Sequence, residues 1–272
     1  MALLVRTWNV FHGNAVPPER RAYLERMVRL ATVDRPDVVC LQELPVWSLR
    51  RLAEWSEGMA VVPAIAAPPR LGPLPSTAEV GRILTGVDHG RFRSAFTGQA
   101  NAILLSPRLH LVEHAEIDLN PRRFRAAQAK WLDLDPLLCL AWAKERRVCQ
   151  AARVLLDDGR TAIVANLHAT SLHADERVAD AELRRAAVFV DALAAPDEPI
   201  LLCGDFNIPP ERSRTLADLE QPDWGFSRAV PGIDQVLVRG LDVREIGPWP
   251  EERRRVDGRL VSDHTPVEAV FA

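Results

Sequence analysis

The sequence lacks paired cysteines. Its four cysteines, Cys40, Cys139, Cys149 and Cys203, are scattered along the chain and form no C-x-x-C pair. This spacing excludes the common cysteine cage for zinc and the dithiol redox motif. Cys40 and Cys203 lie in apolar runs, where a free thiol behaves as a small hydrophobic side chain. We therefore expect a reduced protein with cytoplasmic localisation.

Long apolar stretches are also missing. No run approaches the roughly 18 residues that a membrane-spanning helix needs, so we expect no membrane span. The opening residues, MALLVRTWNVF, are too short and too early for an export signal and are typical of a strand.

The chain has no excess of basic residues. It carries 34 Lys+Arg against 37 Asp+Glu, for a net charge of −3, and Lys130 and Lys144 are its only lysines. This balance excludes the basic surface of a dedicated nucleic-acid coat protein. With 47% hydrophobic and 26% charged residues, the 272-residue chain can bury a substantial core, and global disorder is excluded. We expect a single domain over residues 1–272, and a monomer.

Strand patterns recur along the whole chain. Several segments alternate or are rich in β-branched residues, as half-buried strands are. Asp158-Gly159 is a two-residue hairpin signal, so part of the sheet is expected to be antiparallel. The predicted strands are Leu3–Phe11, Asp37–Gln42, Ala60–Ile65, Asn101–Ser106, His110–Leu119, Val148–Leu156, Thr161–Ala169, Ile200–Cys203, Ile233–Arg239 and Pro266–Phe271.

Fewer segments have helical periodicity. One helix is predicted from about Pro17, a second from about Asp175 to Ala194, and a weaker one over Ser213–Leu219. Residues 66–99 and 120–147 are expected to be long loops, the second of them with a helical alternative. Many strands with few long helices predict an α/β fold in which helices cover the outer faces of two packed mixed sheets.

Polar residues stand at the ends of these strands. Some of these polar residues follow a strand, and others precede one. If the two kinds of strand run antiparallel to each other, all the polar residues lie at one rim of the sheets. They are Asn9, Glu43, Asn166, His168, Asp205 and Asn207 at strand exits, and Asp234 and the Asp263-His264 pair at strand entries.

The chemistry of this set favours a metal-assisted phosphoester hydrolase. Glu43, Asp263 and the Asn9 carbonyl are hard oxygen donors that suit Mg²⁺, with Mn²⁺ as substitute. A remaining carboxylate, Asp205, can orient and deprotonate water. Asp234 can hold His264 as an imidazolium that neutralises phosphoryl charge. His168 and Asn166 can donate to the same phosphoryl oxygens.

The ordered motifs TWNV, LQE, NAILLS, ANLH, GDFN, GIDQVLV and SDHTP resemble those of the endonuclease/exonuclease/phosphatase superfamily. The resemblance extends from residue 7 to residue 267. It implies a DNase I-like four-layer α/β sandwich. It also implies Glu43 as the main metal ligand with Asn9 and Asp263, Asp205 for the nucleophilic water, His168 and Asn207 on the phosphate, and an Asp234–His264 pair.

The motifs depart from the family pattern near Asn9. Many nucleases of the family carry Asp or Asn two positions later, where this chain has Phe11, followed by His12. This departure puts a second metal position in question. We expect His12 and His173 to be surface or loop histidines, and the tryptophans, including Trp131, to pack in the core or at the rim.

The substrate class stays open between alternatives. Arginines in candidate rim loops favour a phosphodiester of nucleic acid, because phosphate contacts dominate such binding. The runner-up is a small or lipid-borne phosphoester, such as an inositol phosphate or a sphingomyelin-like head group. A catalytically dead relative is disfavoured, since all the carboxylates named above and His264 are present. The basic residues in question are Arg91, Arg93, Arg122, Arg123, Arg125, Lys130 and Arg253–Arg255.

Overall fold

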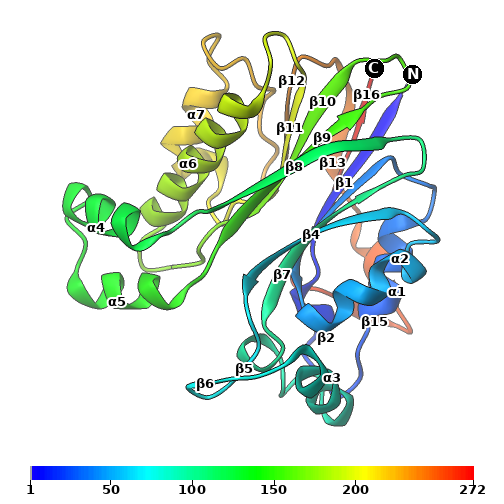
Figure 1. Ribbon diagram of the computed structural model, residues 1–272, viewed down its shortest axis with the longest axis vertical. Coiled ribbons are helices and arrows are strands. Elements are labelled where there is room, and N and C mark those ends of the chain that lie inside the picture. Colours follow the sequence, from blue (N-terminus) through cyan, green and yellow to red (C-terminus); the bar gives the residue numbers. More distant parts are fainter. Residues whose placement is uncertain (1) are drawn as a thin grey trace.

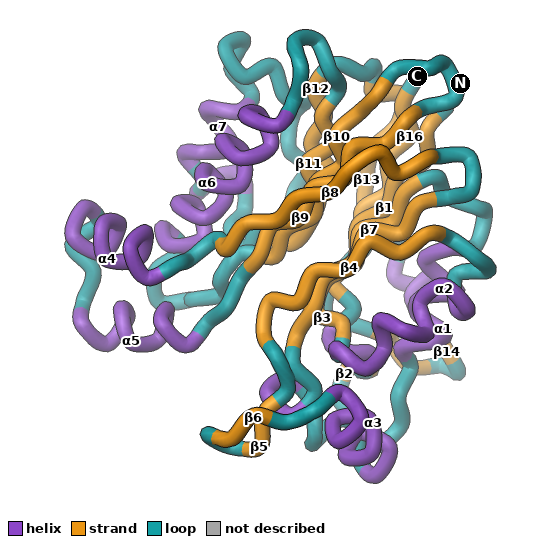
Figure 2. Tube along the Cα trace, in the orientation of Figure 1, coloured by secondary structure: helices purple, strands orange, loops and turns teal. Residues whose placement is uncertain are grey.

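Two large β-sheets pack face to face with helices outside them (Figures 1 and 2). The computed structural model describes residues 2–272. The first sheet has the order β13 (Val243–Pro248), β16 (Val267–Phe271), β1 (Leu3–Asn9), β3 (Val38–Leu44), β7 (Gln99–Leu105) and β4 (Ala60–Ala67). The second has the order β12 (Asp234–Arg239), β11 (Ile200–Asp205), β10 (Thr161–His168), β9 (Val148–Leu155) and β8 (His110–Asp118).

The remaining elements surround this pair of sheets. The helices are α1 (Leu24–Thr32), α2 (Leu52–Trp55), α3 (Ala78–Val87), α4 (Arg122–Trp131), α5 (Pro136–Lys144), α6 (Arg177–Leu193) and α7 (Arg214–Leu219). Short strands form two small sheets, β14 (Arg255–Val256), β15 (Arg259–Val261) and β2 (Ala15–Val16) in one, and β5 (Arg70–Leu71) and β6 (Leu74–Pro75) in the other. Within residues 2–272 no helix combines the length and apolar character that crossing a bilayer requires.

Three apolar layers hold the four structural layers together. Alternate residues of each strand face opposite sides, so Cys40 packs between the sheets while Val39 and Leu41 pack against α1. On the second sheet Val164 faces inward, whereas Ile163 lies against α6. Because both sheets are covered on both faces, the fold is the predicted four-layer α/β sandwich.

The strand register brings the polar strand ends to one rim. The strand β12 runs antiparallel to β11, and Asp234 lies directly opposite Asp205. The strand β10 runs parallel to β11, with His168 beside Asp205. Likewise β1 runs parallel to β3 and places Asn9 beside Gln42. The expectation that strand exits and entries meet is therefore confirmed by the pairing.

Several predicted boundaries are wrong. Helix α1 begins at Leu24, because residues 17–23 form an irregular segment. The backbone N–H of Tyr23, at the end of this segment, donates to the Gly13 carbonyl. The expected loop 66–99 contains α3, and the expected loop 120–147 contains α4 and α5. Strand β13 was not predicted. It pairs with β16 at the sheet edge and is largely exposed, so it lacks the apolar alternation of the other strands.

Strand β11 continues through Gly204 to Asp205, two residues beyond its predicted end. Gly204 has φ +141°, and a Cβ atom there would lie 1.9 Å from the carbonyl oxygen of Leu167 on β10. Only glycine therefore allows the two parallel strands to stay in contact next to Asp205.

We expect Gly204→Ala to lose at least about 3 kcal/mol of unfolding free energy, or to yield no folded protein, because the strands must separate. Gly159→Ala is the matched control. It has φ +83° in the β9–β10 turn with no atom within 4 Å of an added Cβ, and should cost about 1 kcal/mol. Urea denaturation measures both, and equal losses would contradict this reading.

Candidate active site

Asp205 is the buried carboxylate at the centre of the rim, and its side chain is 1% exposed. Its Oδ2 accepts a hydrogen bond from the Asn9 amide at 2.9 Å, and its Oδ1 accepts one from the Asn207 backbone N–H at 3.0 Å. Burial raises the pKa of Asp205 to about 7, and the Asp234 and Glu43 carboxylates add to the rise, while His264 and Asn9 oppose it.

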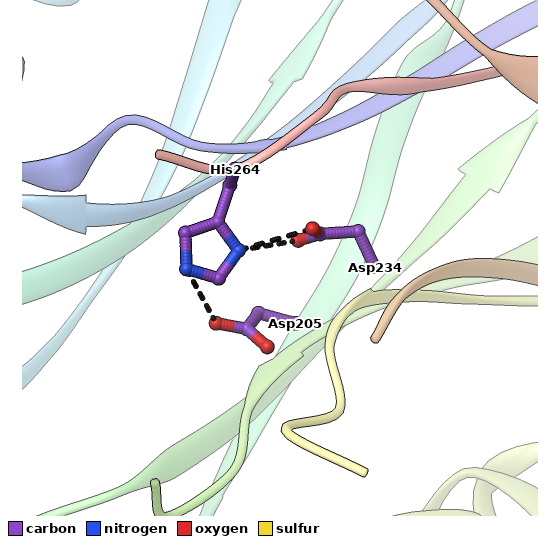
Figure 3. A group of neighbouring side chains, drawn as sticks. All are labelled: Asp205, Asp234 and His264. Carbon is purple, nitrogen blue, oxygen red and sulfur yellow. Dashed lines mark hydrogen bonds and ion pairs between the residues drawn. The ribbon is translucent and has the colours of Figure 1, made fainter. Parts of the chain in front are cut away.

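His264 lies between two carboxylates (Figure 3). Its Nδ1 is 3.0 Å from Asp234 Oδ2, and its Nε2 is 3.7 Å from Asp205 Oδ2. Burial lowers the pKa of His264, but Asp205, Asp234 and Asp263 outweigh this effect and raise the pKa to about 10. The imidazole is therefore cationic at neutral pH. The three groups of Figure 3 are close enough to share a metal ion, but an imidazolium has no lone pair to offer one.

The loop that carries His264 is held by buried hydrogen bonds. Arg254 donates to the His264 carbonyl at 2.8 Å, and Trp8 Nε1 donates to the same oxygen at 3.3 Å. Ser262 Oγ donates to the Asn9 carbonyl at 2.7 Å and accepts from the His264 N–H at 3.0 Å. Arg254, one of the basic residues expected in the rim loops, is 8% exposed and is therefore used to hold this loop.

His168 lies on the other side of Asp205, with Nε2 3.4 Å from Asp205 Oδ2. Its Nδ1 faces two donors, Gln99 Nε2 at 2.9 Å and Arg147 Nη1 at 3.4 Å. Nδ1 must therefore be the acceptor, which leaves the proton on Nε2. Burial lowers the pKa of His168 well below its usual value, and Arg147 lowers it further. A neutral His168 directs an N–H into the site.

Glu43 occupies a bulge in β3 and has a φ of +55°. Its two oxygens lie 3.5 Å from His12 Nε2 and 3.8 Å from His168 Nε2. Both separations are too long for strong hydrogen bonds, so its lone pairs remain available. Strained backbone at a polar rim residue is typical of functional sites.

The carboxylates of the rim repel one another. Desolvation raises the pKa of Asp263, and Glu43 and Asp234 raise it further. His264 opposes this rise. Asn9 Oδ1 accepts from the Phe11 N–H at 3.0 Å and keeps a second lone pair. Glu43, Asp263 and Asn9 together offer hard oxygen atoms, two of the groups being carboxylates. This donor set fits Mg²⁺ or Mn²⁺.

Asn207 extends the site beyond Asp205. Its Nδ2 donates to the Ala169 carbonyl at 2.9 Å, and its own backbone has φ +52°. One amide hydrogen and the amide oxygen remain for other partners.

The predicted phosphate contact of Asn166 is wrong. Its Nδ2 donates to the carbonyls of Leu41 at 3.0 Å and Ala102 at 3.1 Å, and its Oδ1 accepts from Gln42 at 2.7 Å. Asn166 belongs to the second sheet and these partners to the first. The side chain, 0% exposed, is therefore used to join the sheets.

Sequence reasoning also missed residues around the site. His12 lies in the short turn after β1, as a loop histidine would, but it is buried and not at the surface, and its Nε2 is 3.5 Å from Glu43. The only indication in the sequence was that His12 directly follows Phe11, the position where the chain departs from the family pattern. Gln99 and Arg147 had no motif, since their role depends on contact with His168.

A buried carboxylate links the outer helices to the loop after His168. Glu182 of α6 accepts hydrogen bonds from Trp142 Nε1 at 2.6 Å, the Thr170 N–H at 2.7 Å and Thr170 Oγ1 at 2.8 Å. Desolvation raises the pKa of Glu182, and these donors oppose the rise. Trp131, on α4 nearby in sequence, was expected to pack but is 75% exposed.

The comparison with protein families agrees with this geometry. The model of the Endonuclease/Exonuclease/phosphatase family matches residues 7–264. The chain therefore belongs to this family of phosphoesterases. No curated protein matches the chain.

Solved structures share the fold at low sequence identity. A functionally unknown conserved protein from Enterococcus faecalis V583 has a TM-score of 0.67 and 17% identity, covering 99% of each chain. The human Nocturnin catalytic domain with bound sulfate anion has a TM-score of 0.68 and 16% identity, covering 100% of this chain and 93% of its own. D. rerio TDP2 complexed with single strand DNA product has a TM-score of 0.64 and 16% identity, covering 100% and 99%.

The two pKa values at the rim predict a pH profile. A rate that needs Asp205 ionised and His264 protonated should rise with pH, reach half its maximum near pH 7 and decline only toward pH 10. A bound cation stabilises the carboxylate and lowers both midpoints. Asp205→Asn should abolish the acid limb of kcat/KM measured from pH 5 to 9.5. A wild-type rate that increases as pH falls from 7 to 5 would overturn these assignments.

Proposed function

We propose that this chain, acting as one catalytic domain and a monomer, hydrolyses phosphodiester bonds with the help of bound Mg²⁺ or Mn²⁺, and that its substrate is nucleic acid. One observation carries the proposal: a buried carboxylate of raised pKa, Asp205, lies between a neutral histidine N–H and an imidazolium fixed by a second carboxylate. Membership of a phosphoesterase family supports the same reaction class.

Each side chain has a distinct chemical task in this proposal. Asp205 accepts the proton of the attacking water, because its pKa of about 7 matches that of a general base working near neutrality. The His264 imidazolium and the His168 Nε2–H stabilise negative charge on the phosphoryl oxygens. Asp234 keeps His264 oriented and charged. Asn207 offers its free amide hydrogen to the phosphate.

The cation would be held by Glu43, with Asp263 and Asn9. When bound, it supplies Lewis-acid polarisation of a phosphoryl oxygen. Glu43 is the main candidate because its oxygens make no hydrogen bond shorter than 3.5 Å within residues 2–272. The sequence has no C-x-x-C pair and no H-E-x-x-H motif that would supply the thiolates or the histidine pair of a zinc site.

One consideration favours a diester over a monoester, and a second favours nucleic acid among diesters. A diester carries a single charge at the reacting phosphate, which one cation and one imidazolium can neutralise. The TDP2 neighbour is complexed with a single strand DNA product, which supports the proposal by likeness of fold.

A lipid-borne phosphoester is the second candidate, favoured by the surface of α4 and α5. Trp131 and Leu137 are each 75% exposed and Leu140 is 62% exposed. Lys130 and Lys144 end the two helices. Exposed Trp and Leu beside basic side chains are typical of segments that lie in a membrane interface.

Metal removal tests the reaction class. EDTA should abolish hydrolysis, and Mg²⁺ or Mn²⁺ should restore it. Glu43→Gln should raise the cation concentration needed for half-maximal rate at least about tenfold, since a ligand to the cation is neutralised. Glu79→Gln, an exposed carboxylate on α3, is the control and should change nothing. Full activity of the chelated protein, or rescue by Zn²⁺ alone, would exclude this metal site.

Substitution of the charged groups tests their roles. Asp205→Asn and His264→Ala should each lower kcat by about 10²–10⁴-fold, the usual contribution of a positioned base or charge-stabilising group. Both variants should keep the wild-type circular dichroism spectrum. Losses below about tenfold in a folded variant would show that the roles are misassigned.

A panel of substrates distinguishes the two candidates. Plasmid, single-stranded DNA, RNA, an inositol phosphate and a lipid diester in vesicles are each incubated with Mg²⁺ at two salt concentrations. Cleavage of nucleic acid that weakens steeply with salt supports the first candidate. Turnover of the lipid diester alone would replace it with the second.

A further inference from the structure

The two sides of the rim differ in charge. Around Asp205, Asp234 and Asp263 the carboxylates exceed the single imidazolium of His264. Glu43, by contrast, has His12 and His168 as neighbours. Arg147 contacts His168, and Arg93 lies over the ring of Phe11, the residue before His12. We propose that Arg93 and Arg147 form a subsite for a second phosphate of the substrate, one linkage away from the phosphate that is hydrolysed. This inference rests on the proposed function.

Arg93 is a guanidinium without a carboxylate partner. It is half-buried, and its Cζ lies 4.9 Å from the centre of the Phe11 ring. Within residues 2–272 its guanidinium forms no hydrogen bond or ion pair, and the buried Nη1 has no acceptor. A buried N–H group without a partner is costly and rare. Arg20, by contrast, is paired with Asp88 of the same segment.

Arg147 is connected to Glu43 through His168. It is 7% exposed, and one Nη atom contacts Glu145 at 2.7 Å while the other contacts His168 Nδ1 at 3.4 Å. Its buried Nε has no acceptor. His168 in turn lies 3.8 Å from Glu43, so a single side chain separates Arg147 from the proposed cation ligand.

Arg93 is connected to Glu43 in a similar way. The Phe11 ring that supports it precedes His12, whose Nε2 is 3.5 Å from Glu43. Burial lowers the pKa of His12, and both Arg93 and Arg147 lower it further, which indicates that the two guanidiniums act on the same histidine. Two guanidiniums with unused N–H groups on one side of a phosphoesterase site match a phosphate, which arginine binds with paired hydrogen bonds.

This subsite defines the substrate class. A diester with a neighbouring phosphate, as in a polynucleotide or an oligonucleotide with a phosphorylated end, would contact both the reacting centre and the arginines. A diester without one would contact only the centre. The enzyme should therefore prefer the first kind through KM, because the neighbouring phosphate is bound equally before and during reaction.

The test compares three substrates in Mg²⁺: bis(4-nitrophenyl) phosphate, the dinucleotide TpT, and TpT with an added 5′ or 3′ phosphate. The wild-type protein should bind a phosphorylated dinucleotide better than TpT. Arg93→Gln should raise KM for that dinucleotide about 10- to 100-fold, the usual effect of losing a charge-assisted hydrogen bond. Its kcat, and its activity on bis(4-nitrophenyl) phosphate, should stay within about twofold of wild type.

Arg82→Gln is the matched control. Arg82 lies on α3, is exposed and is paired with Glu79, so its loss should leave all three substrates unaffected. Arg93→Lys keeps the charge and the stem over Phe11, and should raise KM about threefold to tenfold even if Arg93→Gln folds poorly. Equal effects of Arg82→Gln and Arg93→Gln, or equal KM for TpT and both phosphorylated forms, would overturn the subsite alone. A wild-type protein that cleaves none of the three would overturn the proposed function as well.

Discussion

The site depends on placing a carboxylate where two sheets meet and keeping it dry. Asp205 ends a strand of the second sheet, yet its closest side-chain donor, the Asn9 amide, comes from the first. A carboxylate with 1% exposure is expensive to ionise. The hydrogen bonds from Asn9 and Asn207, together with the imidazolium, offset that cost in part and leave a pKa near neutrality. Small shifts between the sheets would therefore change the acidity of the group as well as its position.

The contacts that prevent such shifts are polar. Asn166 donates to two backbone carbonyls of the first sheet, and Gln42 donates back to it. Apolar contacts between sheets resist separation but allow sliding, whereas hydrogen bonds with fixed partners determine one alignment. A buried asparagine next to a catalytic rim is thus used here to set register, in a place where the family motif alone would suggest contact with substrate.

Much of the site was predictable from sequence for a simple reason. Polar residues directly after or before buried strands must lie at sheet edges, and the pairing of β11 with β12 then forces Asp205 opposite Asp234. The residues that escaped prediction act through contacts between distant segments. Arg254 holds the His264 carbonyl from a different loop, and Arg147 fixes the tautomer of His168. Helices α4 and α5 were foreseen only as an alternative to a loop, because neither has the half-apolar, half-polar pattern of a packed helix, and both are largely exposed.

The bond between Trp142 and Glu182 has an evolutionary consequence. The face of α5 that carries Trp142 is constrained. Loss of the Trp142 indole N–H would leave the buried Glu182 carboxylate without one of its donors, next to the loop that follows His168. The other face, with Leu137 and Leu140, touches solvent and carries no such obligation. Mutation can therefore remodel the outer surface of this helical excursion, and with it the molecules it meets, while selection on the reacting centre preserves the single tryptophan that anchors it.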